Sequence, residues 1–307
     1  MESVTFRNRG VDIAADIRFP AGYDGSGTYA AVIVGHPISS CKEQTSGHIY
    51  GNGLTEAGYI TLAFDASHQG HSGGEPRFLE DPGARVEDFR AAVDYLVTRD
   101  DVDENRIGLV GICGGAGYAV QAAMTDHRIT ALGTVVAANY GRVMREGDLS
   151  ADAAIRTLEA IGAQRTAEAR GAEPMVTTYI PNSQREREAA GIEDVDIEQA
   201  IDYYKTPRGA AEGSPNKLLF SGLEAVMGFD AFHLVDRLLT QPLQAICGDV
   251  PGAFGSHRDG FELFYKARSQ KKHLLVIPGA THYDLYDQPG PTGKAIAQLQ
   301  AFFDENL

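Results

Sequence analysis

The pentapeptide Gly111-Ile112-Cys113-Gly114-Gly115 places a cysteine among glycines, directly after an apolar run and before an Ala-rich helical pattern. This order of strand, tight turn and helix is that of a nucleophile elbow, with cysteine where serine is usual. Glycines are needed there because side chains beside so strained a turn would collide with neighbouring backbone. The helix dipole is expected to favour the thiolate. The sequence predicts Cys113 as a covalent nucleophile; the alternative is a small buried cysteine in a close-packed turn.

A cysteine nucleophile needs a base and an acid that orients the base. Gly248-Asp249 follows one apolar strand pattern, and Gly279-Ala280-Thr281-His282 follows the next. The chain order Cys113, Asp249, His282 is the order of nucleophile, acid and base in α/β hydrolases. Each residue would lie just beyond the carboxyl end of a strand, where open α/β sheets bind their ligands. We therefore predict that Asp249 orients His282 and that His282 activates Cys113.

Acyl transfer also requires donors for an oxyanion, normally two backbone N–H groups. Gly114 is one predicted donor because it follows the nucleophile. Ile38 is the other, because Pro37 in the same turn has no N–H. His36 is either a residue of the active site or a structural histidine that braces this turn. The other residues predicted to contact the substrate are Tyr140, Tyr179 and Phe229.

Two further motifs offer competing chemistry. Gly70-His71-Ser72-Gly73-Gly74 also matches the serine elbow, but it leads into Glu75-Pro76-Arg77 rather than a helix, so Ser72 is predicted to be a loop residue. Asp65 with two nearby histidines invites a metal site, but no further ligand cluster supports it. Because the triad supplies nucleophile, base and oxyanion donors, we expect neither a metal nor a cofactor.

The elements that must position these residues follow from hydrophobic periodicity. The first residues alternate apolar and polar positions, which predicts an antiparallel hairpin at a sheet edge. Short apolar runs then alternate with helical patterns, which predicts a doubly wound, mostly parallel sheet. The predicted strands are Ala30 to Val34, Tyr59 to Phe64, Arg106 to Ile112, Ile129 to Ala138, Leu243 to Cys247 and Leu274 to Ile277, and the predicted helices are Pro82 to Val97, Ala116 to Met124, His257 to Ala267 and Lys294 to Phe303.

A stretch of about 100 residues without a clear buried strand interrupts this alternation. It is too long for a plain loop in a compact domain, so we predict a helical cap over residues 142–241, inserted into a core of residues 1–141 and 242–307. The alternative is a lengthened surface excursion. The aromatic residues of the predicted cap are expected to line an apolar pocket above Cys113, although several of them could instead pack the core of the cap. They are Tyr179, Tyr203, Tyr204, Phe220, Phe229 and Phe232.

Composition narrows the possible partners. The 307-residue chain is 43% hydrophobic and carries a net charge of −15, from 27 basic and 42 acidic residues. Such a charge disfavours nucleic acid and anionic membrane surfaces, so we expect neither as a partner. The first ten residues lack an apolar h-region, and three widely spaced cysteines make no disulfide framework. We expect a cytoplasmic protein with reduced thiols; a homodimer stays open.

Several motifs taken together resemble α/β hydrolases of the YcjY-like group, which is related to dienelactone hydrolases. The resemblance covers most of the chain and is weakest in the cap; it implies hydrolysis of an ester, lactone or thioester. Dienelactone hydrolases have a similar Cys-Asp-His triad but carry a glutamate where this sequence has His36-Pro37, so dienelactone is not implied as the substrate. The motifs are His36-Pro37, Lys42-Glu43-Gln44-Thr45, Phe64-Asp65-Ala66-Ser67, Gly70 to Pro76, Gly111-Ile112-Cys113 and Gly279-Ala280-Thr281-His282.

The sequence thus predicts a capped hydrolase that acts on a small acyl substrate with an apolar or aromatic, polyketide-like body through an acyl-cysteine. Two alternatives remain. The same site could catalyse cyclisation, acyl transfer or carbon–carbon cleavage, or the chain could be a non-catalytic binding protein in which the cysteine marks a decayed serine. The scarcity of Lys and Arg in the motif loops favours an uncharged substrate. Arg77 and Arg142 are expected near the rim of the pocket, each as a member of a surface ion pair rather than as a cation that binds the substrate.

Overall fold

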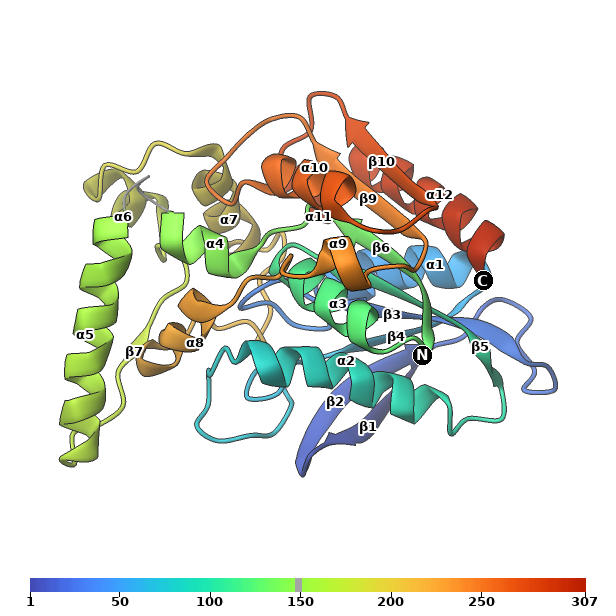
Figure 1. The fold of residues 1–307 in the computed structure, drawn as a ribbon, viewed down its shortest axis with the longest axis horizontal. Coiled ribbons are helices and arrows are strands. Elements are labelled where there is room, and N and C mark those ends of the chain that lie inside the picture. The colour runs from blue at the N-terminus through green and yellow to red at the C-terminus, as the bar shows by residue number, and fades with distance from the viewer. Residues whose placement is uncertain (147–150) are drawn as a thin grey trace.

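The computed structural model describes residues 1–146 and 151–307 and is built on an eight-stranded sheet (Figure 1). In chain order its strands are β1 (Glu2–Asn8), β2 (Val11–Arg18), β3 (Tyr29–Gly35), β4 (Ile60–Phe64), β5 (Val102–Ile112), β6 (Ile129–Val135), β9 (Leu243–Gly248) and β10 (Lys272–Ile277). The order across the sheet is β1-β2-β4-β3-β5-β6-β9-β10. Only the pairs β1–β2 and β2–β4 are antiparallel. The predicted mostly parallel sheet with an edge hairpin is confirmed.

Helices cover both faces of this sheet. On one face lie α2 (Pro82–Leu96), α3 (Gly114–Thr125) and α10 (Ser256–Lys266), whose Phe89, Tyr118 and Leu263 share one buried cluster. On the other lie α1 (Asn52–Glu56) and α12 (Pro289–Asn306), whose Leu54 and Phe303 belong to a second cluster. The central strands are continuous apolar runs because both of their faces are covered. A π-helix (Thr45–Gly51) precedes α1, and a short helix, α11 (Asp284–Asp287), precedes α12.

The chain between β6 and β9 is mainly helical, as predicted, and residues 147–150 of the predicted cap lie outside the described residues. In Figure 1, α5 to α8 gather beyond one end of the sheet. The last helix, α9, packs instead against α3 and α10 of the core. The exact limits of the cap therefore stay a prediction. The elements are α4 (Tyr140–Glu146), α5 (Ala151–Ala169), β7 (Val176–Thr177), α6 (Gln184–Ala189), α7 (Val195–Lys205), β8 (Leu218–Leu219), a 3-10 helix (Phe220–Gly222), α8 (Leu223–Gly228) and α9 (Val235–Leu238).

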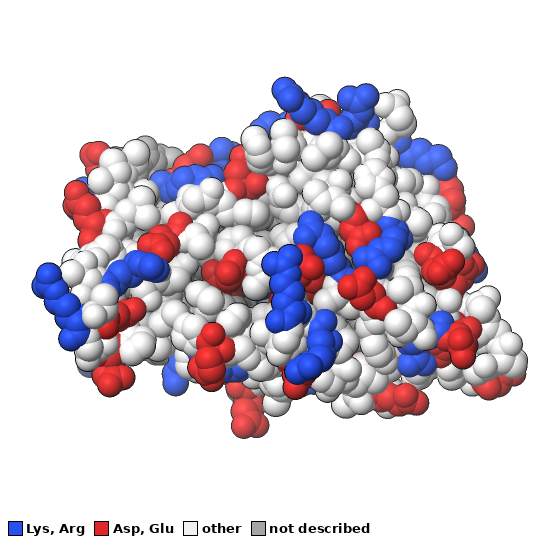
Figure 2. Space-filling view, turned by 60° about the horizontal axis from the view of Figure 1, so that its bottom comes forward, with Lys and Arg blue, Asp and Glu red and all other residues white. Residues whose placement is uncertain are grey.

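The surface and the helices bear on possible partners. Among the described residues, no helix combines the length and apolar character that crossing a bilayer requires. On the face drawn in Figure 2, Lys and Arg side chains are intermingled with Asp and Glu side chains. The expectation that neither nucleic acid nor a membrane is a partner stays a prediction.

Candidate active site

The predicted elbow is present between β5 and α3. Cys113 has φ 54° and ψ −128°, a conformation that is strained for a residue with a side chain. A Cβ atom at Gly111 would lie 2.4 Å from Cα of Ala116, and one at Gly115 would lie 2.3 Å from the carbonyl oxygen of His36. These contacts explain why only glycine fits on either side of the nucleophile.

The Cys113 thiol is buried beside three hydrogen-bond donors. Burial raises the pKa of the thiol to about 11, while the hydrogen bonds that the Tyr286 hydroxyl and the N–H groups of Gly114 and Ile38 can donate to the thiolate act in the opposite direction. The two predicted oxyanion donors are therefore brought together at the sulfur. The prediction that the helix N-terminus favours the thiolate is therefore wrong. Desolvation of the sulfur outweighs the hydrogen-bond donors, so the resting thiol is neutral.

This pKa predicts how the thiol reacts with iodoacetamide. At pH 7 a pKa of about 11 leaves about one thiol in 10⁴ ionised, so alkylation of Cys113 should be slow and should accelerate about tenfold per pH unit up to pH 9. Peptide mass mapping after timed quenching would follow modification of residue 113, with Cys113→Ser as the blank. A rate that is already maximal at pH 7 would show a preformed thiolate and contradict the prediction.

His282 is buried beside the same hydroxyl. Its Nε2 atom lies 3.3 Å from the Tyr286 hydroxyl, and its Nδ1 atom lies 3.0 Å from Oγ of Ser256. Among the described residues, no direct hydrogen bond joins His282 to Cys113; Tyr286 bridges them. Burial lowers the pKa of His282 to about 3, so the imidazole is neutral at rest.

Asp249 does not meet His282. It is exposed after β9, and its carboxylate accepts a hydrogen bond of 2.6 Å from the N–H of Gly279 in the turn after β10. Ser256, the first residue of α10, occupies the place behind the imidazole that the acid was predicted to fill. The predicted pairing of Asp249 with His282 is thus corrected, because the chain after β9 turns Asp249 outward before bringing Ser256 inward.

This geometry makes Asp249→Asn a mild substitution. Because an asparagine oxygen can still accept from the Gly279 N–H, we expect kcat/KM for a p-nitrophenyl ester to stay within about tenfold of wild type. A stopped-flow or plate assay of purified variants would measure it. A loss of about 10⁴-fold, the size expected when a triad acid is removed, would reinstate Asp249 as the partner of His282.

His36 braces the turn that carries Ile38. Its Nδ1 atom lies 2.7 Å from the carbonyl oxygen of Pro37, and its Nε2 atom lies 3.0 Å from both the N–H of Ala66 and a guanidinium nitrogen of Arg85. Arg85 also donates to the carbonyl oxygen of His36. With both ring nitrogens occupied and 1% of its surface exposed, His36 fits the bracing alternative and not the predicted contact with substrate.

An apolar cavity of about 240 Å³ lies under the cap elements. Tyr140 and Tyr179 line it, as predicted for substrate-binding residues, and both lie close enough to Cys113 for its charge to affect their pKa values. Tyr179 stacks on Phe254 with ring centroids 5.8 Å apart, and Phe254 lies 5.2 Å from the His282 ring. The remaining lining residues are Val143, Met144, Thr177, Thr178, Ile197, Leu218, Leu223 and Ala253.

The other predicted aromatic residues serve packing. Phe229 does not line the cavity; its ring packs against Tyr118 of α3, with centroids 5.5 Å apart, which corrects its predicted contact with substrate. Phe232 is buried in the core, and Phe220 packs against the same cluster. Tyr203 and Tyr204 of α7 form a buried aromatic group with Tyr283 and Tyr286, next to the thiol.

Three other residues considered in the sequence analysis, Ser72, Arg142 and Arg77, have structural roles. Ser72 is buried in a loop, where its hydroxyl donates to the carbonyl oxygen of Asp65 and accepts from the N–H of Ala14. Arg142 is buried in an ion pair with Asp259, 2.7 Å away, rather than at a pocket rim. Arg77 donates to the carbonyl oxygens of Ser72 and Gly70, and so holds the same loop.

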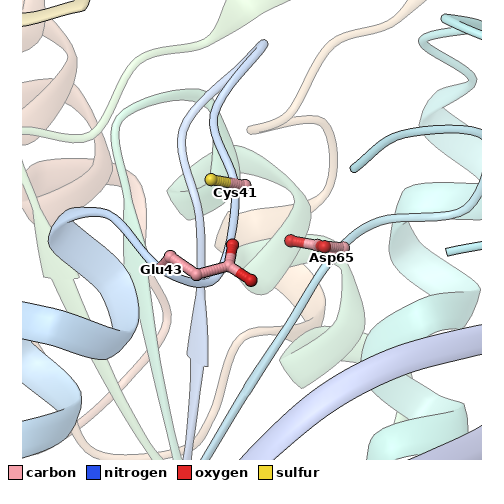
Figure 3. A group of neighbouring side chains, drawn as sticks. All are labelled: Cys41, Glu43 and Asp65. Atoms are coloured by element: carbon pink, nitrogen blue, oxygen red, sulfur yellow. The ribbon is translucent and has the colours of Figure 1, made fainter. Parts of the chain in front are cut away.

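The metal site that the sequence analysis considered and did not expect would need Asp65, His68 and His71. Nδ1 of His71 lies 3.2 Å from Oδ2 of Asp65, whereas Nδ1 of His68 lies 3.1 Å from the carbonyl oxygen of Pro76. Asp65 also clusters with Cys41 and Glu43, and the two carboxylates point toward each other (Figure 3). Asp65 accepts hydrogen bonds from the N–H groups of Lys42 and His71, at 2.7 and 2.8 Å. Glu43 is paired with the Lys42 ammonium. These partners already satisfy the carboxylates, so the cluster fixes the loop after β3 and carries no argument for a metal.

A doubly wound sheet with a cysteine elbow, backbone N–H donors and a histidine beyond the last strand defines the α/β-hydrolase class. The family model described as "Alpha/beta hydrolase family" matches residues 47–294, and the chain belongs to this family. It is 39% identical to protein YcjY of Escherichia coli K12, over 98% of this chain and 96% of YcjY. The YcjY-like part of the resemblance is thereby supported; the relation to dienelactone hydrolases stays a prediction.

Two further comparisons extend this result. The crystal structure of PA2218 from Pseudomonas aeruginosa superimposes with a TM-score of 0.89 at 33% identity, over 100% of this chain and 93% of that one. Thiohydrolase apmlB of Arthrinium phaeospermum is 31% identical over 162 residues, which span 49% of each chain. These comparisons support the α/β-hydrolase fold and the general assignment of the protein as a hydrolase.

Proposed function

We propose that this protein hydrolyses an ester, lactone or thioester of a largely apolar acyl substrate through a covalent acyl intermediate on Cys113. The observation that carries the proposal is the position of the thiol, which sits in a strained elbow beside the N–H groups of Gly114 and Ile38. An acyl group bound to the sulfur there would place its oxygen within reach of both donors. The thiohydrolase relative supports a thioester among the possible substrates.

In this mechanism Tyr286 relays the proton. In the resting site the Tyr286 O–H donates to Nε2 of His282, and Nδ1–H donates to Ser256. As the sulfur attacks the carbonyl carbon, the thiol proton passes to the Tyr286 oxygen and the tyrosine proton passes to His282. The imidazolium of His282 and the negative charge on the sulfur therefore form only during attack. This is consistent with the pKa values of the thiol and the imidazole, which keep both groups neutral at rest.

The cavity supports the substrate class. Its walls are mainly aliphatic and aromatic, and Arg142, which precedes the lining residue Val143 in α4, is already paired with Asp259. An uncharged acyl chain would be stabilised there by burial of apolar area, whereas a dianion would find no free cation among the described lining residues.

A substrate panel tests the proposal. Neutral p-nitrophenyl esters and acyl thioesters of increasing chain length should be hydrolysed to the free acid, while carboxylated analogues should react at least about tenfold more slowly in kcat/KM, equivalent to about 1.4 kcal/mol. Added EDTA should change neither rate. Product analysis by mass spectrometry separates hydrolysis from cyclisation or transfer. Binding of these substrates without turnover by the folded protein would overturn the proposal in favour of a binding module.

A further inference from the structure

A buried carboxyl group from the cap lies close enough to Cys113 for its charge to affect the pKa of the thiol, and it is not used by the mechanism above. Asp196 is in the first turn of α7 and is 1% exposed. Its Oδ2 atom accepts a hydrogen bond of 3.0 Å from the N–H of Phe254, whereas its Oδ1 atom is buried without a partner. A buried polar atom without a partner destabilises the folded state, so its retention calls for a ligand or a reaction that uses it.

The surroundings hold this carboxyl in one place. A Cβ atom at Gly252 would lie 2.2 Å from Cγ of Asp196, so the loop after β9 presses directly on it. The preceding Asp194 caps α7 and accepts from the N–H of Asp196 itself. Ile197 and Phe254, its chain neighbour and its hydrogen-bond donor, both line the cavity. The group is thus rigid and borders the space that the substrate would occupy.

The charged and titratable groups around Asp196 offer it no cation. The Cys113 thiol, the Tyr283 hydroxyl and the Asp194 carboxylate are the groups with which it interacts electrostatically. Among the described residues, no Lys, Arg or His forms an ion pair with it. Burial therefore dominates and raises the pKa of Asp196 to about 7, which makes both protonation states available near neutral pH.

We propose that Asp196 is a second acid–base group of the active site, which protonates the leaving group during acylation and takes a proton from water during deacylation. This inference rests on the proposed acyl-cysteine mechanism and deepens it. It assigns to the cap a chemical role in addition to covering the site.

The proton balance closes over the two half-reactions. In acylation the S–C bond forms and the bond from the acyl carbon to oxygen or sulfur breaks; the thiol proton ends on His282 through Tyr286, and the Asp196 proton ends on the departing alcohol or thiol. In deacylation water attacks the thioester and gives its proton to the Asp196 carboxylate. The departing sulfur recovers its proton from His282 through Tyr286, which restores the resting site.

The test is burst kinetics with Asp196→Asn, which keeps the shape of the side chain and an acceptor for the Phe254 N–H. With a p-nitrophenyl ester, whose leaving group needs no proton, the burst of p-nitrophenol should persist within about tenfold of the wild-type rate, while steady-state turnover falls about 10²-fold. With an alkyl ester, acylation itself should also fall about 10²-fold. Asp194→Asn makes the same chemical change at the N-cap of the same helix, where asparagine also caps well. It should preserve both the burst and the turnover and shift only the pH limb to lower pH, because it removes a like charge near Asp196.

The pH profile gives a second readout. Wild-type kcat for the p-nitrophenyl ester should rise with pH through about 7 as Asp196 ionises, and this limb should be absent in Asp196→Asn. Unchanged turnover in the variant, or equal loss of burst and turnover, would overturn the proposal. Should the variant not fold, a wild-type profile without a limb near pH 7 would overturn it. Full activity of Cys113→Ala on the same ester would instead refute the acyl-cysteine mechanism.

Discussion

Cys113→Ala is expected to lower kcat for ester or thioester hydrolysis by about 10⁴- to 10⁶-fold, the largest effect of any substitution in this protein. No other group in the described site can take the place of the sulfur: Ser256 is bonded to His282 and is separated from the elbow by the imidazole and Tyr286. Cys113→Ser should retain only a small fraction of the activity, because a hydroxyl is harder to ionise than a thiol. Initial rates on a p-nitrophenyl ester would measure both.

The chain offers a matched control for this substitution. Cys247 lies buried in β9, and burial raises the pKa of its thiol to about 11 as well. Cys247→Ser therefore removes an equally buried thiol without touching the elbow, and it should keep wild-type kcat/KM. Equal losses in the Cys113 and Cys247 variants would show that stability, and not nucleophilicity, explains the effect.

The second large effect is expected at His282 and Tyr286. Without the imidazole, the thiol proton has no acceptor, so His282→Ala should lower kcat by about 10⁴-fold or more. Tyr286→Phe removes only the hydroxyl that bridges the two groups and should lower kcat by about 10²- to 10³-fold. Because the residues act as one relay, the double variant should be no slower than His282→Ala.

Two controls accompany these variants. Tyr203→Phe removes a hydroxyl from the same aromatic group, and Tyr203 packs against Tyr286 with ring centroids 5.1 Å apart, so this variant reports the effect of losing a neighbouring hydroxyl that does not bridge the thiol and the imidazole. Thermal melts should show that all variants fold. Full activity of Tyr286→Phe would mean that His282 contacts the thiol directly during turnover, and losses that multiply in the double variant would contradict a shared relay.

The nucleophile and its donors could be predicted from sequence because local constraints fix them. Gly111 is required by contacts with Ala116 within the elbow itself, Gly115 fits the glycine pattern of the motif although its contact is with the distant His36, and Ile38 follows from the absent N–H of Pro37. The strands could be predicted for a similar reason. A strand covered on both faces must be mainly apolar, and β3, β4, β6 and the buried second half of β5, Ile107 to Ile112, are.

The groups behind His282 could not be predicted in the same way. Chain order placed Asp249 after the correct strand. In the structure, however, the loop after β9 first directs Asp249 outward, where it accepts from the Gly279 N–H, and then brings Ser256 inward to His282. The path of this loop depends on the hydrogen bond between Phe254 and Asp196 of the cap. Such contacts between distant segments leave no local pattern.

Tyr286 and Asp196 differ in whether the sequence held a signal that could have identified them as residues of the site. Tyr286 lies four residues after His282, a spacing that puts both side chains on one face of a helical turn and was available as a signal. Asp196 looks in sequence like an acidic residue in the first turn of a helix, where the dipole favours it. Its burial arises only from the packing of α7 against the loop after β9.

The central claim is a covalent acyl group on Cys113, and intact-protein mass spectrometry after rapid acid quench tests it most directly. Mixing the wild-type protein with a p-nitrophenyl ester should produce a species heavier by one acyl group, and peptide mapping should locate it on Cys113. Cys247→Ser should give the same species and Cys113→Ala none. Turnover of the ester with no acyl adduct at any quench time, or an adduct on Ser256 or Ser72, would contradict the account.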